Sequence, residues 1–324
     1  MIKKISEIIL VLLICAICIG KITTFKVDKS VNYDGVAVAQ ESVPRATEGA
    51  NDPSTLNPEA MFRSMRLAYN EKLIVAASMR EETLVHDQLF IGIGNYMEKI
   101  DNAKRYLRME MSYSCDSIRY SVQYIADGAK DLFWIFKNVG SEKELCRVDL
   151  FSKLNAQNAN PELVASIDNN IITPISLAGI PYMLFQINKN FNFTSCSIVH
   201  DEQTKIPYCV IVGAWKLERF PIQELVKDKV IDWNSVPADI PDTVKVYFGI
   251  SDYFPYKIYY YRTFRGKQTL ISKLNFYDVS FDVRLNPKQF GFEPPAEIIA
   301  SDITNRYTIM KKENKPEKKT SSSF

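Results

Sequence analysis

The stretch "YLRMEMSY", residues 106–113, alternates apolar and polar side chains and decides the fold class of the chain. The apolar side chains lie on one side of an extended backbone and the polar ones on the other, namely Leu107, Met109, Met111 and Tyr113 against Arg108, Glu110 and Ser112. A period of two residues is typical of a β-strand that buries one face. The stretch therefore predicts a half-buried strand.

The next two stretches along the chain repeat this pattern. Residues 117–128, "SIRYSVQYIADG", end in a turn at Asp127-Gly128, and residues 131–140, "DLFWIFKNVG", return directly. The predicted apolar faces are Ile118, Tyr120, Val122 and Tyr124 in the first stretch and Leu132, Trp134 and Phe136 in the second. Alternating strands joined by short loops predict an antiparallel meander.

Two segments show helical periodicity instead. Asn57 is a suitable N-cap with Pro58 at the first helical position, and a helix should follow directly. A second amphipathic helix is predicted over 179–191, with Pro181 near its start. Its apolar stripe is Ile180, Met183, Leu184, Ile187 and Phe191. More strands follow, so the order is helix, meander, helices, meander.

A segment near 220–242, bounded by prolines, interrupts the later strands. It carries enough apolar residues for a short packed helix, and surface decoration is the other interpretation. The residues concerned are Leu225, Val226, Val230 and Ile231.

The N-terminus has the features of an export signal. Lys3 and Lys4 precede an apolar run from Ile8 to Gly20, which is short for a membrane span and suits a signal peptide. We assign residues 1–39 to a signal peptide, with an N-terminal membrane anchor as the alternative, and 40–57 to a polar linker. Residues 306–324 are predicted to be a disordered lysine-rich tail. The protein is expected to be periplasmic.

Composition limits the partners. The 324 residues are 46% apolar and 12% aromatic, which is ample for a packed core. The formal net charge is +2, and the signal region and the tail each carry an excess of lysine, so the folded part has no strong basic field for nucleic acid.

Four cysteines follow the signal region. A hairpin with a two-residue loop at Glu202-Gln203 would place Cys196 opposite Cys209, and export supplies an oxidant, so these two form a candidate disulfide. Free buried thiols are the alternative. Cys115 and Cys146 are weaker candidates for pairing.

The sequence lacks the common catalytic motifs. It contains neither G-x-S-x-G nor H-E-x-x-H, and "GIGNYM", residues 92–97, lacks the third glycine of a dinucleotide fingerprint. Its two histidines, His86 and His200, form no convergent acid–base couple with a neighbour, because adjacent strand residues face opposite sides. We expect no enzyme activity, no cofactor and no metal.

Four features together resemble the LolA family of periplasmic lipoprotein carriers, and in particular its longer exported relatives. They are a first helix leading into strands, "IADGAKDLFWIF", "GISDYFPYKIYYY" and "FGFEPPAEIIASD". The resemblance covers about residues 58–305. It implies an α+β fold, an incomplete antiparallel β-barrel with a few helices over its concave face. It also implies that the F-x-F-x-P-P segment closes the last strand, so that Pro294 and Pro295 end the fold.

The same resemblance implies a binding function. The concave face would take lipid or the acyl chains of lipoproteins, with envelope membrane proteins as further partners and a monomeric state. The predicted cavity residues are Leu107, Met109, Met111, Ile118, Tyr120, Tyr124, Trp134 and Phe136. The predicted lid is the helix carrying Ile180, Met183, Leu184 and Ile187.

Two further points of the resemblance stay open. Carriers of this family hold the lid closed with an arginine before the cavity strand, and Lys104 and Arg105 lie near that place in a different register. The alternative function is that of an RseB-like envelope sensor, which uses the same fold to bind a protein partner.

Overall fold

The computed structural model describes residues 57–303, apart from gaps at 86–87, 102–103, 117, 129, 131, 150–174, 203, 238–239 and 265. The predicted signal peptide, the tail and all of the linker except Asn57 lie outside the described residues. No helix in the described part of the chain combines the length and apolar character that a bilayer span requires.

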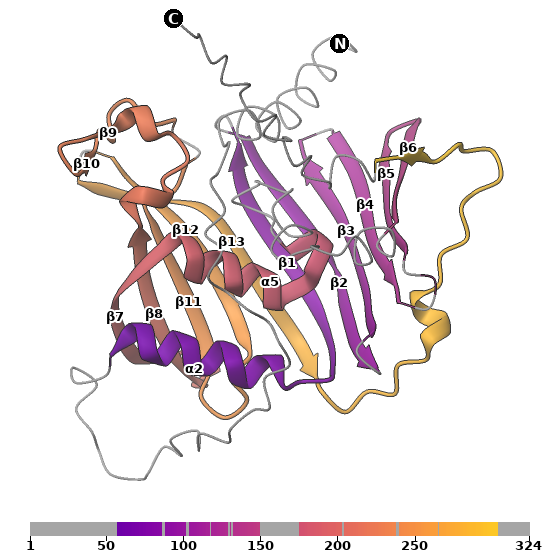
Figure 1. Ribbon diagram of the computed structural model, residues 1–324, viewed down its shortest axis with the longest axis horizontal. Helices are drawn as coiled ribbons and strands as arrows, with labels where there is room; N and C mark the ends of the chain where they lie inside the picture. Colours follow the sequence, from indigo (N-terminus) through magenta and orange to yellow (C-terminus); the bar gives the residue numbers. More distant parts are fainter. Residues whose placement is uncertain are drawn as a thin grey trace, which may run out of the picture.

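One 12-stranded sheet forms the body of the protein (Figure 1). Its spatial order is β14 (Ser301–Asp302), β6 (Glu142–Asp149), β5 (Leu132–Val139), β4 (Ile118–Asp127), β3 (Lys104–Cys115), β2 (Gln88–Asp101), β1 (Ile74–Val85), β13 (Lys267–Ser280), β12 (Pro255–Phe264), β11 (Thr243–Gly249), β8 (Pro207–Trp215) and β7 (Phe191–His200). Every neighbouring pair is antiparallel except β14 with β6. The sheet is curved and open, which confirms the predicted incomplete barrel.

The sheet consists of two meanders that meet in the middle. Strands β1 to β6 follow one another in space as they do in sequence, and so do β11 to β13. The two groups join where β1 pairs with β13, with Arg80 opposite Asn275 and Thr83 opposite Ser272. The junction therefore connects residues that are about 190 positions apart in the chain.

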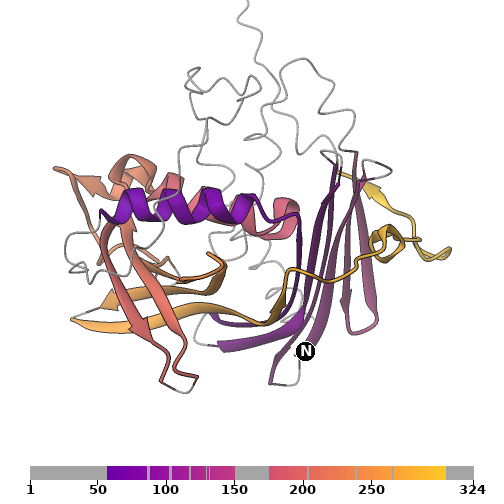
Figure 2. The ribbon, with the colours of Figure 1, turned by 90° about the horizontal axis from the view of Figure 1, so that it is seen from below.

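Two helices, α2 (Pro58–Asn70) and α5 (Ile175–Asn190), cross the open side of the curved sheet (Figure 2). The Asn57 side chain accepts hydrogen bonds from the backbone N–H groups of Glu59 and Ala60, which confirms the predicted N-cap. Helix α2 buries Phe62 against Phe193, with ring centroids 4.1 Å apart. We call the helix-covered side of the sheet the concave face and the other side the convex face.

The segment near 220–242 contains a short hairpin, so the packed helix, one of its two interpretations, is wrong. Its apolar residues form the short strands β9 (Val226–Lys227) and β10 (Val230–Ile231), preceded by the 3-10 turn η3 (Gln223–Leu225). Arg262 of β12 holds the segment, because its Nη2 donates to the carbonyl oxygens of Trp233 and Val236. Its guanidinium group also lies 4.4 Å from the centroid of the Trp233 ring.

The C-terminal F-x-F-x-P-P segment does not close the last strand, so that prediction is wrong. After β13 the chain forms the 3-10 turn η4 (Pro287–Phe290), crosses the convex face and reaches β14, which pairs in parallel with β6. We call residues 284–303 the strap. Pro294 and Pro295 lie within it and do not end the fold, because the backbone pairing resumes at Ser301.

Candidate functional site

The concave face of the central strands carries a large apolar surface. Met109 of β3 lies opposite Tyr96 of β2, and Met111 lies opposite Gly94. Leu107, Met109 and Met111 are each at most 2% exposed, as is Met79 of β1. The period of two in residues 106–113 therefore identified the buried side of β3 correctly.

Two glycines of β2 create the room for these side chains. A Cβ atom on Gly92 would come within 2.5 Å of the Tyr113 ring, and one on Gly94 would lie 2.6 Å from the Met111 sulfur. The same added atom on Gly94 would lie only 1.8 Å from the Glu110 carbonyl oxygen. The glycines of the "GIGNYM" stretch thus serve close side-chain packing.

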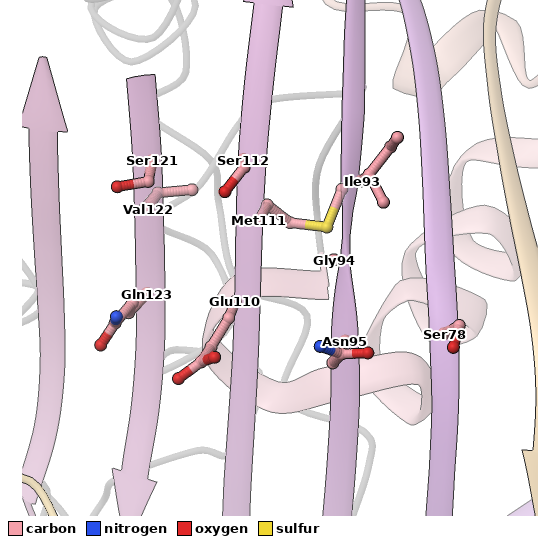
Figure 3. A pocket seen from close by; sticks show the side chains of 10 residues that line it. All are labelled: Ser78, Ile93, Gly94, Asn95, Glu110, Met111, Ser112, Ser121, Val122 and Gln123. Atoms are coloured by element: carbon pink, nitrogen blue, oxygen red, sulfur yellow. The ribbon is translucent and has the colours of Figure 1, made fainter. Parts of the chain in front are cut away.

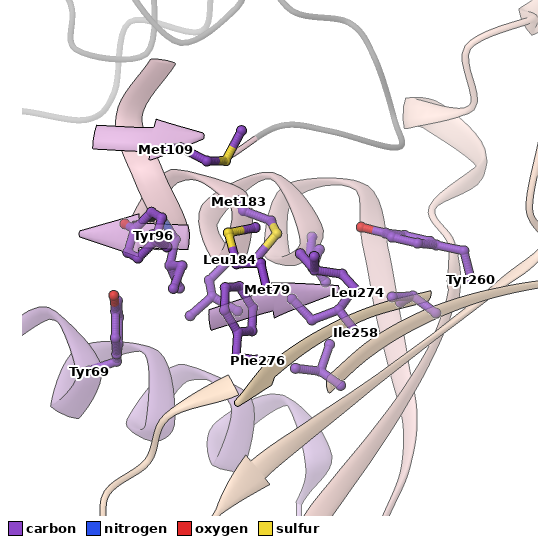
Figure 4. Close-up of a cluster of buried hydrophobic side chains, with 14 of the residues drawn as sticks. Tyr69, Met79, Tyr96, Met109, Met183, Leu184, Ile258, Tyr260, Leu274 and Phe276 are labelled. Carbon is purple, nitrogen blue, oxygen red and sulfur yellow. Dashed lines mark hydrogen bonds between the residues drawn. The ribbon is translucent and has the colours of Figure 1, made fainter. Parts of the chain in front are cut away.

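Helix α5 covers this surface with its apolar stripe. Ile180, Met183, Leu184 and Ile187 are all buried in the same core cluster as Met109. Figure 4 shows Met183 and Leu184 of α5 beside Met79 of β1. These four residues of the predicted stripe are confirmed, but the fifth, Phe191, is wrong, because α5 ends at Asn190 and Phe191 begins β7. The helix begins at Ile175, before the predicted start, and Pro181 lies inside it.

The N-terminal half of α5 is fixed to the sheet at Tyr96. The Tyr96 hydroxyl accepts the backbone N–H of Ile180 at 3.1 Å. The preceding residue, Gly179, has a φ of +68°, and a Cβ atom there would lie 2.5 Å from the Tyr96 hydroxyl oxygen. Only glycine combines this backbone conformation with so close an approach.

Glu98 joins both helices to the sheet. Its Oε2 accepts hydrogen bonds from Tyr96 at 2.5 Å and from Tyr69, in the last turn of α2, at 3.3 Å. Its Oε1 lies 3.0 Å from Nε of Arg105. Burial, followed by the nearby charges, raises the pKa of both tyrosines well above the usual value, so both hydroxyls stay protonated and donate. Arg105 therefore acts on α5 through Glu98 and Tyr96.

A second buried carboxyl group, Glu81 of β1, lies on the same face. Its Oε2 accepts from the Tyr113 hydroxyl at 2.6 Å, and its Oε1 accepts from Oγ1 of Thr83 at 3.1 Å. Glu81 is 4% exposed and Glu98 is 3% exposed. The sequence analysis named neither residue, although each continues the buried parity of its strand, two positions after Met79 and Tyr96.

The structure unites some of the predicted cavity residues and separates others. Tyr120 and Tyr124 of β4 pack against the same core cluster, and the Tyr120 ring stacks on Tyr113 with centroids 4.6 Å apart. Ile118 pairs with Cys115 through the backbone, and its side chain lies outside the described part.

Trp134 and Phe136 lie on the convex face, so their assignment to the concave cavity is wrong. Both pack against Phe292 of the strap, with centroid distances of 5.5 Å and 6.1 Å. Strand β5 buries both of its faces, and its concave residues are Phe133 and Ile135. The alternation that guided the prediction is absent because the strap covers the outer face.

The convex face also carries a shallow hollow of about 480 Å³ (Figure 3). Its lining is Ser78, Ile93, Gly94, Asn95, Glu110, Met111, Ser112, Ser121, Val122 and Gln123. The lining mixes hydroxyl, amide and carboxylate groups with the apolar side chains of Ile93, Met111 and Val122, so it is less suited to an acyl chain than the apolar concave face.

Cys196 and Cys209 are close without being direct partners. The loop spans residues 201–206, with His200 opposite Pro207, so Cys196 lies opposite Ile211 and Cys209 opposite Ile198. The predicted register, based on a two-residue loop, is wrong. The two Sγ atoms are nevertheless 3.2 Å apart, and both residues are free thiols in the structure. The disulfide therefore stays a prediction.

The described residues contain no group of three or more His, Cys, Asp or Glu side chains that could hold a metal ion.

Comparisons with known proteins found structural neighbours only. No family model matches the chain, and no curated protein matches it. A MucA/MucB complex from Pseudomonas aeruginosa has 10% identity and a TM-score of 0.35, over 73% of this chain and 62% of that one. An outer-membrane lipoprotein-sorting protein domain from Vibrio parahaemolyticus has 11% identity and a TM-score of 0.31, over 72% of this chain and 97% of that one.

A DUF1329 family protein from Desulfovibrio piger is similar at 8% identity and a TM-score of 0.30, over 73% of this chain and 98% of that one. This chain spans about 60% of the length of the MucB chains that it matches. The superpositions are loose, so the roles of residues follow from this chain's own geometry.

Proposed function

We propose that the concave face binds lipid or the acyl chains of lipoproteins in the periplasm, without catalysis, and that α5 is its lid. The observation that carries this proposal is the group of methionines under α5, in which Met79 and Met109 of the sheet and Met183 of the helix share one core. Unbranched, flexible thioether side chains adapt to a mobile chain. Each methylene that enters such a surface contributes about 0.8 kcal/mol without directional contacts.

The attachment of α5 supports a movable lid. The side chains of its stripe are apolar and can be replaced by another apolar group, whereas the bond from the Ile180 N–H to Tyr96 is directional. A ligand chain that takes the place of Met183 and Leu184 would keep the apolar surface buried while the helix lifts. The apolar surface of the sheet then stays buried under the ligand. The free energy of opening comes mainly from breaking the polar contacts around Tyr96 and Glu98.

The test is native mass spectrometry of the protein purified from its own envelope, followed by a fluorescent fatty-acid binding assay. Met109→Glu places a carboxylate on the apolar surface and should abolish ligand retention, because burying an unpaired charge is costly. Ile93→Glu adds the same charge to the convex face, where Ile93 is 59% exposed, and should retain the ligand. Met109→Trp keeps the surface apolar but fills it, and should also reduce binding.

Circular dichroism spectra confirm that each variant is folded before its binding is compared. Lipid retention in folded Met109→Glu and Met109→Trp proteins would exclude this face as the binding site. An empty wild-type protein that also fails to bind every added amphiphile would reject the acyl-chain function.

A second candidate function, binding of an envelope protein partner, is favoured by strand β7. This strand ends the order of the described sheet and pairs only with β8 within it. Ile198 and Val199 on it are 48% and 43% exposed. An edge strand with exposed apolar side chains can accept a partner strand by β-augmentation. Ile198→Lys should abolish capture of such a partner and leave lipid retention unchanged.

A further inference from the structure

A compact polar cluster interrupts the apolar concave face at Glu81. We define the Glu81 cluster as Glu81, Thr83, Tyr113 and Ser272. Tyr113 and Thr83 donate to the two carboxylate oxygens of Glu81, and the hydroxyl groups of Thr83 and Ser272 are 3.0 Å apart. All four residues are buried. The cluster is built from β3, β1 and β13. Strand β2 lies between β3 and β1, and its Gly92 leaves the Tyr113 ring room to reach Glu81, so the cluster is a fixed part of the sheet.

The cluster adjoins the proposed acyl-chain surface. Glu81 follows Met79 by two positions on β1, and Tyr113 follows Met111 by two positions on β3, so both continue the concave face. The direct partner of Glu81 on β13 is Leu274, which belongs to the same core cluster as Met183. An amphiphile whose chain lies on the methionines therefore brings its polar end within reach of Glu81.

No positive charge faces Glu81 among the ion pairs of the described residues. The nearest basic side chains along the strands, Arg80 and Lys273, both pair with Glu82, at 2.9 Å and 2.8 Å, on the convex face. Glu98 differs in this respect, since Arg105 compensates its charge. An anionic head group beside Glu81 would meet a carboxyl group and phenols, with no cation to balance it.

The other groups at this place are neutral donors and acceptors. Tyr120 stacks on Tyr113, and Tyr260 of β12 is buried close enough to sense the charge of Glu81. Burial raises the pKa of Tyr113 and Tyr120, so they remain uncharged phenols. Hydroxyl groups and a carboxyl group in this arrangement suit a ligand group that both donates and accepts hydrogen bonds.

We propose that the Glu81 cluster receives the polar end of the bound amphiphile and selects an uncharged hydroxyl, ester or amide head group over an anionic one. This inference rests on the proposed acyl-chain function and names the chemical class of its ligand. Glu81 is the residue that sets the discrimination, because a carboxylate repels a carboxylate or phosphate at short range and accepts a hydroxyl or amide hydrogen bond.

The test compares amphiphiles of one chain length on the full-length protein. Monopalmitoylglycerol, palmitate and hexadecylammonium compete with a fluorescent fatty-acid analogue at pH 8. The wild-type protein should bind monopalmitoylglycerol at least tenfold more tightly than palmitate. Glu81→Gln removes the charge and keeps the shape of the side chain. The affinity for palmitate should therefore rise, and the ratio of the affinity for monopalmitoylglycerol to that for palmitate should fall about tenfold. The matched control Glu82→Gln, on the convex face, should leave the ratio as in the wild type.

Each outcome decides the assignment. An unchanged ratio in folded Glu81→Gln protein, or an equal change in Glu82→Gln, would overturn it. Preferential binding of hexadecylammonium by the wild type would show that Glu81 pairs with a cation and would also overturn it. If Glu81→Gln does not fold, a wild-type preference that fails to increase from pH 5 to pH 8 counts against the proposal. Absence of binding by all three amphiphiles would reject the acyl-chain function itself.

Discussion

The hydroxyl of Tyr96 accepts the backbone N–H of Ile180 at 3.1 Å and donates to Glu98 at 2.5 Å, so a single phenol links helix α5 to the buried carboxylate. Tyr69 of α2 donates to the same carboxylate oxygen, and Arg105 pairs with the other. Both helices therefore share one polar anchor on the sheet. Lys216 binds the C-terminal end of α5 through hydrogen bonds to the carbonyl oxygens of Asn188 and Asn190, so we expect the Tyr96 anchor to set how readily the N-terminal half of the proposed lid opens.

Removal of the Tyr96 hydroxyl should loosen α5 while leaving the sheet intact. Tyr96→Phe deletes two hydrogen bonds and leaves the Ile180 N–H unpaired, which costs roughly 1–3 kcal/mol. We expect faster hydrogen–deuterium exchange in peptides from α5 and faster uptake of a fluorescent acyl chain. Tyr259→Phe is the matched control, because it removes a bond to Asn275 on the other meander. Equal exchange in α5 of both variants would show that Tyr96 does not hold the lid.

Stability should depend on pH through Glu81. Burial raises the pKa of Glu81. The hydrogen bonds from Tyr113 and Thr83 lower it, but the effect of burial is larger. The folded state therefore binds the proton more tightly than the unfolded state, whose carboxyl group titrates near about 4.3. The stabilisation of the fold by the protonated Glu81 is complete below the unfolded-state pKa. It is lost as pH rises through the folded-state pKa. The phenols that face Glu81 stay neutral and add no opposing change.

Urea unfolding at pH 5 and pH 8 checks this dependence. The fall in stability with rising pH should be smaller in Glu81→Gln than in the wild type. Glu82→Gln should leave this fall almost unchanged. Although its slight burial acts the other way, hydrogen bonds from Lys273 and Arg80 lower the pKa of Glu82, so its contribution to stability changes only below about 4.3, where the unfolded carboxyl group titrates. The same pH dependence in Glu81→Gln as in the wild type would contradict the prediction.

The Gly94 position should tolerate no side chain. Gly94→Ala would place its Cβ 1.8 Å from the Glu110 carbonyl oxygen and 2.6 Å from the Met111 sulfur. Met111 can move, but the backbone of β3 cannot move without breaking the β2–β3 pairing, so we expect a loss of roughly 1–3 kcal/mol. Thermal unfolding measures it. Gly291→Ala is the control, since the nearest atom there lies at 3.4 Å, and a loss of stability as large in this control would contradict the steric explanation.

Cys196 and Cys209 should join when the protein meets a disulfide oxidant. Attack of one thiolate on the oxidant forms a mixed disulfide and releases one thiol of the oxidant, and attack of the second thiol forms the Cys196–Cys209 bond and releases the other, so two electrons and two protons pass to the oxidant. The hydrogen bond from Cys209 lowers the pKa of Cys196, which favours Cys196 as the attacking thiolate. The closed loop would stabilise the fold by roughly 3 kcal/mol in the chain-entropy model.

Non-reducing peptide mapping after treatment with oxidised glutathione measures this bond. Cys115 and Cys146 provide the internal control, since both are buried free thiols and should remain alkylatable after denaturation. Recovery of Cys196 and Cys209 as alkylated thiols would reject the bond. A Cys196→Ser variant should lose the gain in stability that oxidation gives the wild type.

The sequence predicted those parts of the fold where only one face of a strand is covered. Residues 106–113 alternate because the outer side chains Arg108 and Glu110 pair with each other in solvent-accessible positions, at 2.6 Å. Helix α5 was found because Ile180, Met183, Leu184 and Ile187 recur at helical spacing. In these elements the period reports directly on burial.

The wrong predictions of side-chain orientation arise where a segment distant in sequence covers the second face of a strand. Residues 132–136 are an unbroken apolar run, and local periodicity could not assign Trp134 to the convex side without knowledge of the strap. The alternation of Phe290 and Phe292 in the strap favoured a strand, but Asn286 caps a 3-10 turn at its start. The predicted pairing of Cys196 with Cys209 is wrong for a local reason. The loop is longer than two residues, and the register of β7 against β8 is therefore shifted by two residues.

The candidate site was predicted only in its apolar half. Met109 and Met111 followed from alternation, whereas Glu81 and Glu98 occupy buried positions at which charged residues are rare. Their partners, Tyr113, Tyr69 and Arg105, come from other elements. The tertiary arrangement alone shows that these carboxyl groups are paired.

The pairing of β1 with β13 has a consequence for synthesis of the chain. The first meander, β1 to β6, can form as soon as its residues are free to fold, but the edge of β1 then waits for more than a hundred further residues before Ser272 can meet Thr83. During that interval β1 exposes unpaired backbone groups and one side of a methionine-rich surface. Such non-local closure is slow and prone to aggregation. A holdase chaperone that shields this edge is therefore expected to raise the yield of folded protein.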